Sequence, residues 1–521
     1  VEIFAQALQE FSIQVPALGR EFRIARGERI LTEVSHKFRP QAFIASLERL
    51  GLHSTWHAAS AEEFGLFLFS KPRAPRPARP AEPTLEPLAQ LSAQRARTLQ
   101  IVAPLSDVDL ERQHSPLLSP IAWDLGHIAE FERQWLLPDP AEPSALDDDA
   151  ARLYDAMRTP RAARSQLPLP PLSEVWTRLK SVRQRVEQSY AVRQRDASSA
   201  PALPAGDFSL ALVAQHEAQH QDTILQAIAL RDDLEYRPAF ASNAAVRPAQ
   251  RPATERVLIP GGPFVMGSND RDWAYDNERP AHEVNVPSFW LARAPVSNAQ
   301  YLAFIAADGY RQRKLWSEAG WAWLAQTDCA APAHWRPAGK GDRDSLGNWR
   351  ALVFGRLEPI EPEGIVSHVS FYEAEAYTHW AGGRLPTEAE WEKAAAWDPS
   401  QGAARRFPWG DSPWDSTRAN LDQERLQPSL VNSYPEGTSA YGCLHMLGDV
   451  WEWTDTWFDG YPGFESFPYQ EYSRAFFGSQ YRVLRGGAFV TRAVVARNSF
   501  RNWDLPERRQ IFSGFRCAWP A

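Results

Sequence analysis

The sequence predicts a multidomain α and α+β protein in which a four-helix bundle precedes a larger, irregular α+β domain. Three observations support this prediction. The chain of 521 residues is too long for one ordinary domain. Apolar residues recur at helical spacing through residues 88–235. Beyond residue 254 the pattern changes to short strand-like runs rich in Gly, Trp and turn residues.

The N-terminal segment, residues 1–71, is too small to be a complete enzyme domain. It mixes the strand-like runs Phe22–Ile24 and Phe64–Phe69 with one helical stretch, Pro40–Leu50. Prolines recur every few residues in the stretch that follows, which favours neither helix nor central strand. We therefore predict an extended linker over residues 72–87.

Residues 88–235 are predicted to form the bundle. Ser119 and Pro120 together predict a helix start, with an N-cap followed by proline at the first helical position. The helix that follows places Leu125, Ile128 and Trp135 on a core face. Three of the bundle helices are expected over Ile121–Leu137, Ser173–Ser189 and Phe208–Arg231.

Residues 254–521 are predicted to form the α+β domain, with only two clear helices, Asn298–Ala307 and Ser370–Ala381. The chain has 21 tryptophans, and packing is the expected role of most of them.

The composition argues against several classes of partner. A net charge of −8 disfavours nucleic acid and anionic membranes. No apolar run approaches the ~20 residues that span a bilayer, and no signal peptide is recognisable, so we expect a cytoplasmic location. The three cysteines (Cys329, Cys443 and Cys517) are too few and too scattered for a disulfide framework or a thiolate metal site.

His216 and His220 form the most informative pair of residues. At i and i+4 of one helix they lie on the same face, which suits two ligands of one metal ion. Val213, Ile224 and Ala227 share that face, so we expect the pair to face the interior of the bundle.

A third histidine, His127, lies on another helix of the same bundle, so three imidazoles can meet at one metal. The sequence motif His216-Glu217-x-x-His220 also matches the zinc-protease helix, where the Glu is the general base. Against that interpretation, the third histidine lies upstream, and Glu217 can instead accept a hydrogen bond from a ligating imidazole. Three neutral imidazoles leave open positions for iron(II) chemistry, but the spacing does not separate iron from zinc.

Several longer blocks extend the signal: SPIAWDLGHIAEFERQWLL, LYDAMRTPRAARSQLPLP, HEAQHQDTILQA, IPGGPFVMGS, GGRLPTEAEWEKAA, GDVWEWT, YRVLRGGAF and SFRNWDLPERRQIFSGFR. Residues 88–521 thereby resemble the sulfoxide synthases of ergothioneine biosynthesis. These are mononuclear non-haem iron enzymes with a DinB-type bundle and a domain of the formylglycine-generating (sulfatase-modifying, C-type-lectin-like) type. The family uses O2 to join a cysteine thiol to C2 of the imidazole of Nα-trimethylhistidine (hercynine), leaving a sulfoxide.

The resemblance implies a role for each matching residue. It implies that Fe(II) is bound by His127, His216 and His220. It implies a hercynine pocket made of Gln219, Tyr472, Asn502 and Trp503, and aromatic faces suit a quaternary ammonium that cannot donate hydrogen bonds. It implies that the thiol substrate is held by Arg161, Asp504 and Arg508, since carboxylates favour arginine and an α-ammonium favours a carboxylate. Tyr469 matches the tyrosine that donates a proton to the oxygen intermediate, although Tyr461 and Tyr472 flank it in the same loop.

The resemblance predicts an iron(II)- and O2-dependent hercynine sulfoxide synthase, with γ-glutamylcysteine as thiol donor and cysteine as the alternative. The rivals are an ovothiol-type synthase acting on histidine itself, a zinc hydrolase using Glu217, and a non-catalytic binding module. Formylglycine generation needs a late cysteine pair, but the strand Tyr481–Arg497 has no cysteine and Cys517 stands alone. The oligomeric state stays open.

The first 71 residues resemble the C-terminal end of the histidine Nα-methyltransferase that makes hercynine, through VEIFAQALQEF and ALGREFRIARGERILTEVSHKFRP. Glu33 and Ser35 fall on positions that in that family hold the histidine imidazole. The S-adenosylmethionine-binding portion is absent from the sequence, so this segment is either the tail of a longer fusion or a relic of one.

Overall fold

The structure is a computed structural model. It describes residues 87–137, 145–195, 208–241, 255–339 and 345–521, with Leu203 and Gly206; before residue 87 it describes Arg26 and the backbone of six strands. The chain separates into two units, Val1–Pro83 and Thr84–Ala521. Each is described by itself.

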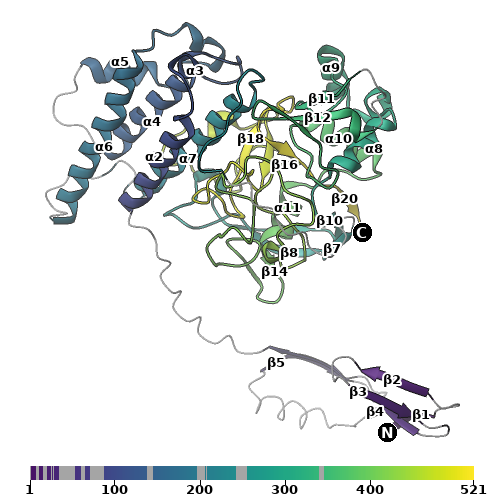
Figure 1. The fold of residues 1–521 in the computed structure, drawn as a ribbon. Coiled ribbons are helices and arrows are strands. Elements are labelled where there is room, and N and C mark those ends of the chain that lie inside the picture. The colour runs from purple at the N-terminus through teal and green to yellow at the C-terminus, as the bar shows by residue number, and fades with distance from the viewer. Residues whose placement is uncertain are drawn as a thin grey trace. The chain divides into compact units, whose positions relative to one another are not determined.

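The described residues of the N-terminal unit form three antiparallel strand pairs, β1–β4, β2–β3 and β5–β6 (Figure 1). Their bounds are β1 Glu2–Gln6, β2 Phe11–Val15, β3 Arg20–Ile24, β4 Arg29–Val34, β5 His53–Ala59 and β6 Gly65–Ser70. The strand runs predicted near residues 22–24 and 64–69 are therefore confirmed as β3 and β6. The predicted helix Pro40–Leu50, Ser35 and the linker up to residue 86 lie outside the described residues.

The second unit begins with the helical bundle. Its helices are α2 Pro87–Val102, α3 Asp107–Glu111, α4 Ile121–Leu136, α5 Ala145–Leu153, the 3₁₀ helix η2 Arg161–Gln166, α6 Leu172–Arg195 and α7 Phe208–Ala229. Helix α4 packs against both α6 and α7, and α7 also packs against α2. The predicted four-helix core of the bundle is thus formed by α2, α4, α6 and α7 (Figure 1).

The predicted N-cap of α4 is wrong. Pro120, not Ser119, precedes the first helical residue, and no side chain caps the helix. The hydroxyl of Ser119 instead accepts a hydrogen bond of 2.5 Å from Nη1 of Arg164. A tertiary contact therefore takes the serine away from the local role that its sequence position favours.

The α+β domain is built from small sheets joined by loops. Its strands are β7 Arg256–Ile259, β8 Gly262–Met266, β9 His282–Val286, β10 Phe289–Ala292, β11 Trp335–Pro337, β12 Trp349–Val353, β13 Arg356–Pro359, β14 Trp397–Asp398, β15 Ala403–Ala404, β16 Trp451–Trp457, β17 Arg482–Arg485, β18 Asn502–Asp504, β19 Ser513–Gly514 and β20 Ala518–Pro520. The larger sheets have the orders β20-β10-β7, β11-β12-β13 and β18-β17-β16-β19. In the last of these sheets, β16 pairs parallel with β19 and antiparallel with β17.

Its helices are α8 Asn298–Ala306, α9 Glu318–Thr327, α10 Phe371–Trp380 and α11 Glu388–Ala396, with 3₁₀ turns η3 Asp276–Glu278, η4 Gly309–Arg311, η5 Arg313–Leu315, η6 Leu346–Asn348, η7 Pro435–Gly437 and η8 Arg474–Phe476. The prediction of only two clear helices is therefore wrong, since α9 and α11 were missed. Both carry a local start signal, because Ser317 caps α9 and Thr387 forms a capping box with Glu390 on α11.

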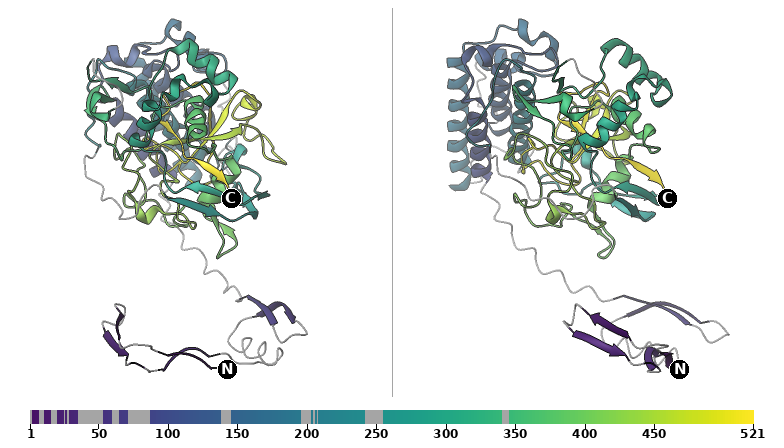
Figure 2. Two further views of the ribbon diagram at one scale, coloured as in Figure 1. Left: turned by 90° about the vertical axis from the view of Figure 1, so that its right-hand side faces the viewer. Right: turned by 45° about the vertical axis from the view of Figure 1, so that its right-hand side comes forward.

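The bundle and the α+β domain share one hydrophobic core. Leu212 and Ile224 of α7 belong to the same buried cluster as Phe489 and Phe512 of the α+β domain. Figure 2 shows the bundle lying against the side of that domain. Because α7 lies at this junction, it is buried on nearly every side. Among the residues that the structure describes, no helix combines the length and apolar character needed to cross a bilayer.

Candidate metal centre

Three histidines meet between α4 and α7. His127 comes from α4, and His216 and His220 lie one turn apart on α7. One ligand atom from each lies within 4.8 Å of the others, and Nε2 of His127 is 3.0 Å from Nε2 of His216. The structure therefore brings together the three predicted ligands, although 89 residues separate the first two in sequence.

Hydrogen bonds orient two of the three rings. Nδ1 of His127 lies 2.6 Å from the carbonyl oxygen of Tyr154, and Nδ1 of His220 lies 2.9 Å from Oδ1 of Asp124. Because both partners are acceptors, each Nδ1 carries the proton and each Nε2 keeps a free lone pair. These are the ring forms that a metal ion needs.

His216 is oriented by stacking. Its ring lies 3.6 Å from the ring of Phe131, at an interplanar angle of 7°. Burial is the main cause that lowers the pKa of His216 and of His127 well below the usual value. Both imidazoles are thus neutral near pH 7, which is the state that binds metals.

The residues around this point fit a divalent cation. The donor set consists of three imidazoles. The carboxylate of Asp124 lies beside them and is 1% exposed, and its Oδ2 has no hydrogen-bond partner among the residues that the structure describes. A buried carboxylate held by one imidazole leaves negative charge that a nearby cation would compensate.

Glu217, the glutamate of the zinc-protease motif, points away from this centre. Its carboxylate accepts hydrogen bonds from Nε of Arg95 at 2.9 Å and from the hydroxyl of Thr98 at 2.7 Å. Arg95 and Arg183 also bind Glu132, so two arginines and two glutamates neutralise one another. The suggestion that Glu217 accepts a hydrogen bond from a ligating imidazole is therefore wrong, and Asp124 has that position.

Several predicted substrate residues adjoin α7. Nε2 of Gln219 donates to the hydroxyl of Tyr472 at 3.4 Å. The ring of Tyr472 stacks on Tyr275 at 4.4 Å and meets the edge of Trp503 at 6.2 Å. Trp503 and Asn502 lie on β18. The structure therefore brings three of the predicted residues together, with Tyr472 in contact with both Gln219 and Trp503.

The predicted thiol-binding residues form a second group. Nε of Arg508 lies 3.7 Å from Oδ1 of Asp504, and both side chains are less than one-fifth exposed. Nε and Nη1 of Arg508 are buried and have no hydrogen-bond partner within the described ranges. Burial raises the pKa of Asp504, and the charges of Arg508 and of Arg161 on η2 oppose that rise. This interaction places Arg161 near the other two, although its side chain is exposed.

Tyr469 and Tyr461 lie in different surroundings. Tyr469 stacks on Trp135 of α4 at 5.6 Å, and burial raises its pKa. Trp135 contacts Phe131, the residue under His216, so aromatic rings connect Tyr469 to the histidines. Tyr461 contacts Arg501 and His282 instead, and it makes no described contact with the histidine cluster. Of the loop tyrosines, Tyr469 and Tyr472 are the ones joined to the centre.

Three residues at the centre were missed from the sequence: Asp124, Phe131 and the carbonyl of Tyr154. Two of them had a local signal, because Asp124 and Phe131 lie three residues before and four residues after His127 on α4. The Tyr154 carbonyl lies beyond α5 and had none.

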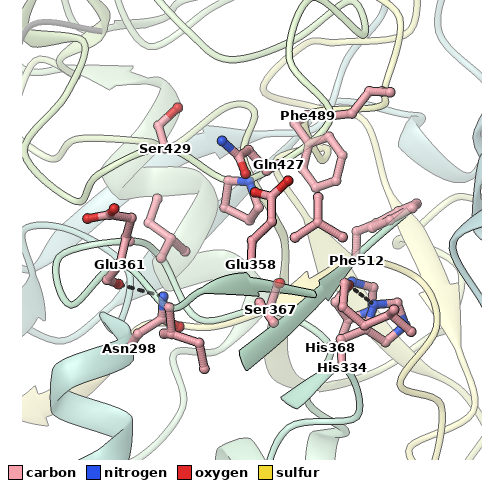
Figure 3. Close-up of a pocket in the computed structure, with 18 of the residues that line it drawn as sticks. Asn298, His334, Glu358, Glu361, Ser367, His368, Gln427, Ser429, Phe489 and Phe512 are labelled. Atoms are coloured by element: carbon pink, nitrogen blue, oxygen red, sulfur yellow. Dashed lines mark hydrogen bonds between the residues drawn. The ribbon is translucent and has the colours of Figure 1, made fainter. Parts of the chain in front are cut away.

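A separate cavity of about 480 Å³ opens at the C-terminal end of α7, beside Ala229. Figure 3 shows His334 and His368 lying together beneath Phe512, with Glu358 across the space. The two imidazoles stack at 3.5 Å, and their Nδ1 atoms lie 3.1 Å from backbone carbonyl oxygens. None of the predicted site residues lines this cavity.

Comparisons with known proteins agree with this architecture. Residues 242–521 match the model of the sulfatase-modifying factor enzyme 1-like domain, residues 90–224 match the DinB superfamily, and residues 1–71 match the SAM-dependent histidine-specific methyltransferase family. The protein is thus a bundle of the DinB class joined to a domain of the sulfatase-modifying class, as the predicted fold class requires.

Full-length relatives identify the family. The hercynine oxygenase of Mycolicibacterium thermoresistibile is 46% identical over 440 residues, covering 82% of this chain and 94% of that protein. That of Mycolicibacterium smegmatis is 45% identical over 444 residues, covering 82% and 97%. The formylglycine-generating enzyme of Thermomonospora curvata is 34% identical over 309 residues, but covers only 54% of this chain and 98% of that protein. The chain belongs to the hercynine oxygenase family, the sulfoxide synthases of ergothioneine biosynthesis.

Proposed function

We propose that the protein is an iron(II)- and O2-dependent sulfoxide synthase that joins the thiol of γ-glutamylcysteine to C2 of the hercynine imidazole. The main observation in support is the meeting of three imidazoles from α4 and α7 within 4.8 Å. Membership of the hercynine oxygenase family supplies hercynine and oxygen as the expected reactants.

His127, His216 and His220 would hold the iron. Hydrogen bonds to Nδ1 leave Nε2 of His127 and His220 as the ligand atoms. When bound, iron(II) on three neutral nitrogens supplies open coordination positions and electrons for reducing O2. A zinc hydrolase is disfavoured, because its general base would be Glu217, whose carboxylate is occupied by Arg95 and Thr98.

Gln219, Tyr472, Asn502 and Trp503 would hold hercynine. A trimethylammonium group offers no hydrogen-bond donor, so its partners are aromatic faces such as those of Tyr472 and Trp503. The contact of Gln219 with Tyr472 joins this pocket to the helix that carries two of the ligands. The imidazole of hercynine would thereby be held next to the histidine cluster.

Arg161, Asp504 and Arg508 would hold the thiol substrate. Nε and Nη1 of Arg508 make no hydrogen bond to any described residue, so they are suited to a carboxylate, which accepts two parallel hydrogen bonds from a guanidinium. Asp504 would bind the ammonium group, and Arg161 would bind a further carboxylate. γ-Glutamylcysteine has two carboxylates, which favours it over cysteine when two arginines are present.

Tyr469 would supply a proton during oxygen reduction. Burial raises its pKa, so its hydroxyl keeps the proton at neutral pH and is available as a donor. In the overall reaction the S–H and C2–H bonds break, a C–S and an S–O bond form, and O2 leaves its second oxygen as water.

Metal analysis combined with oxygen uptake tests the proposal. We expect one iron per chain after anaerobic loading, and O2 consumption coupled to sulfoxide formation only when hercynine and a thiol are both present. Stoichiometric zinc with peptidase activity would refute the assignment. Histidine substituting fully for hercynine would indicate the ovothiol-type reaction instead.

Competition between γ-glutamylcysteine and cysteine tests the thiol preference. We expect a higher kcat/KM for γ-glutamylcysteine, and Arg161→Ala should reduce that preference by raising its KM. Equal kcat/KM values for both thiols would contradict the assigned role of Arg161.

A further inference from the structure

We propose that Asp124 is a positioning residue of the metal centre. Its carboxylate fixes the ring form of His220 and supplies the negative charge that compensates a divalent cation on three neutral imidazoles. This inference rests on the proposed function in one respect, namely that the three histidines bind a divalent metal.

The geometry at His220 supports the first part. Oδ1 of Asp124 lies 2.9 Å from Nδ1 of His220, on the side of the ring opposite Nε2. A carboxylate in this position keeps the proton on Nδ1, aims Nε2 at the metal and increases its basicity. His127 receives only a neutral carbonyl partner, and His216 receives a stacked ring. His220 is thus the ligand with an anionic partner.

The charge balance supports the second part. Asp124 is 1% exposed, and its Oδ2 has no hydrogen-bond partner among the described residues. The charge of Arg164 also acts on Asp124, but the described hydrogen bonds of that guanidinium go to the hydroxyl of Ser119 and the carbonyl of Thr159. A buried carboxylate without a directly bonded cation is unfavourable unless a cation comes close. The histidine cluster is where that cation would lie.

The test compares Asp124→Asn and Asp124→Ala with a matched control, Glu130→Gln. Asparagine keeps the size and the hydrogen-bond acceptor but loses the charge, whereas alanine loses both. Glu130 is also on α4 and is 2% exposed, but its carboxylate binds Arg133 and Arg178. The control therefore removes a buried carboxylate from the same helix without touching a histidine.

Anaerobic Fe²⁺ titration against a competing chelator is the first readout. We expect Asp124→Asn to weaken Fe²⁺ binding about 10- to 100-fold, Asp124→Ala to weaken it at least as much, and Glu130→Gln to leave it unchanged. The second readout is the rise in melting temperature that Fe²⁺ causes. This rise should shrink in both Asp124 variants and persist in the control, because a merely structural role would lower both melting temperatures equally.

Wild-type affinity in Asp124→Asn would overturn the inference, even if Asp124→Ala fails to fold. Equal loss of affinity in Glu130→Gln would also overturn it. A wild-type protein that binds no divalent metal would refute the proposed function itself, so the two failures are distinguishable.

Discussion

Two buried clusters of charged and polar groups lie on different faces of α7, and they differ in whether their polar groups satisfy one another. Each cluster contains one of two consecutive residues of α7. Glu217 faces the arginines, and His216 faces the other histidines. Around Glu217, two arginines and two glutamates satisfy one another. Around His216, three imidazole nitrogens face one another within 4.8 Å, and Oδ2 of Asp124 has no hydrogen-bond partner in the described part of the chain. A cluster that is complete serves stability, whereas an incomplete one is prepared for a ligand.

The largest effect is expected when the incomplete cluster loses a ligand. His220→Ala should abolish stoichiometric iron binding and turnover, because two imidazoles do not complete a three-histidine site. The unfolding free energy of the metal-free protein should change little by comparison. Metal content by mass spectrometry and urea unfolding measure the two quantities. Full turnover in this variant would rule out the site.

Removing a charge from the complete cluster should lower the unfolding free energy and leave iron binding nearly unchanged. Glu217→Gln leaves the charges of Arg95 and Arg183 opposed by Glu132 alone, and we expect a loss of about 3–5 kcal/mol in unfolding free energy. Iron affinity of the folded fraction should change little, since the described partners of the Glu217 carboxylate are Arg95, Arg183 and Thr98. If Glu217→Gln lost metal binding but kept its unfolding free energy, Glu217 would have to be counted among the residues of the metal centre.

The stacked pair His334 and His368 extends the comparison to imidazoles buried outside the metal centre. Burial lowers the pKa of His334 to about 4 and that of His368 well below its usual value. Between pH 6.5 and 4 the unfolded chain therefore binds more protons than the folded one, so stability falls as the pH is lowered. From pH 7.5 to 5.0 the wild type should lose roughly 2 kcal/mol more than His334→Gln.

Urea unfolding at the two pH values measures this difference. The matched control is His379→Gln, because His379 is exposed, although its ring also bonds to a backbone carbonyl, that of Leu315. If the unfolding free energy of the wild type falls by the same amount as that of His334→Gln between the two pH values, His334 binds its proton equally well in the folded and unfolded chains.

The smallest effect is expected at the ring under His216. Phe131→Leu keeps an apolar side chain but removes the stack, and such pairs contribute about 0.5–1.5 kcal/mol. Iron affinity should therefore fall about 2- to 10-fold while melting temperature falls modestly. Chelator competition measures the affinity. An unchanged affinity would mean that helix α7 alone positions His216.

Much of the architecture could be predicted because its signals are local. The helical period located α4 and α7 within two residues of their ends, and the i, i+4 spacing identified His216 and His220 as neighbours. Helices α9 and α11 were missed although Ser317 and Thr387 mark their starts, because short helices with little apolar periodicity resemble loops. Ser119 was misassigned because Arg164, far along the chain, binds its hydroxyl.

The sequence by itself determined the order of the domains, the helical spacing of two ligands and the family, since each is written in neighbouring residues or in ordered blocks. Only the tertiary structure decided which carboxylate serves the histidines. Glu217 lies beside His216 in sequence but turns to Arg95, whereas Asp124, 96 residues before His220, reaches its ring. The reason is that successive helical residues point in different directions by about 100°, so packing between helices assigns the partners.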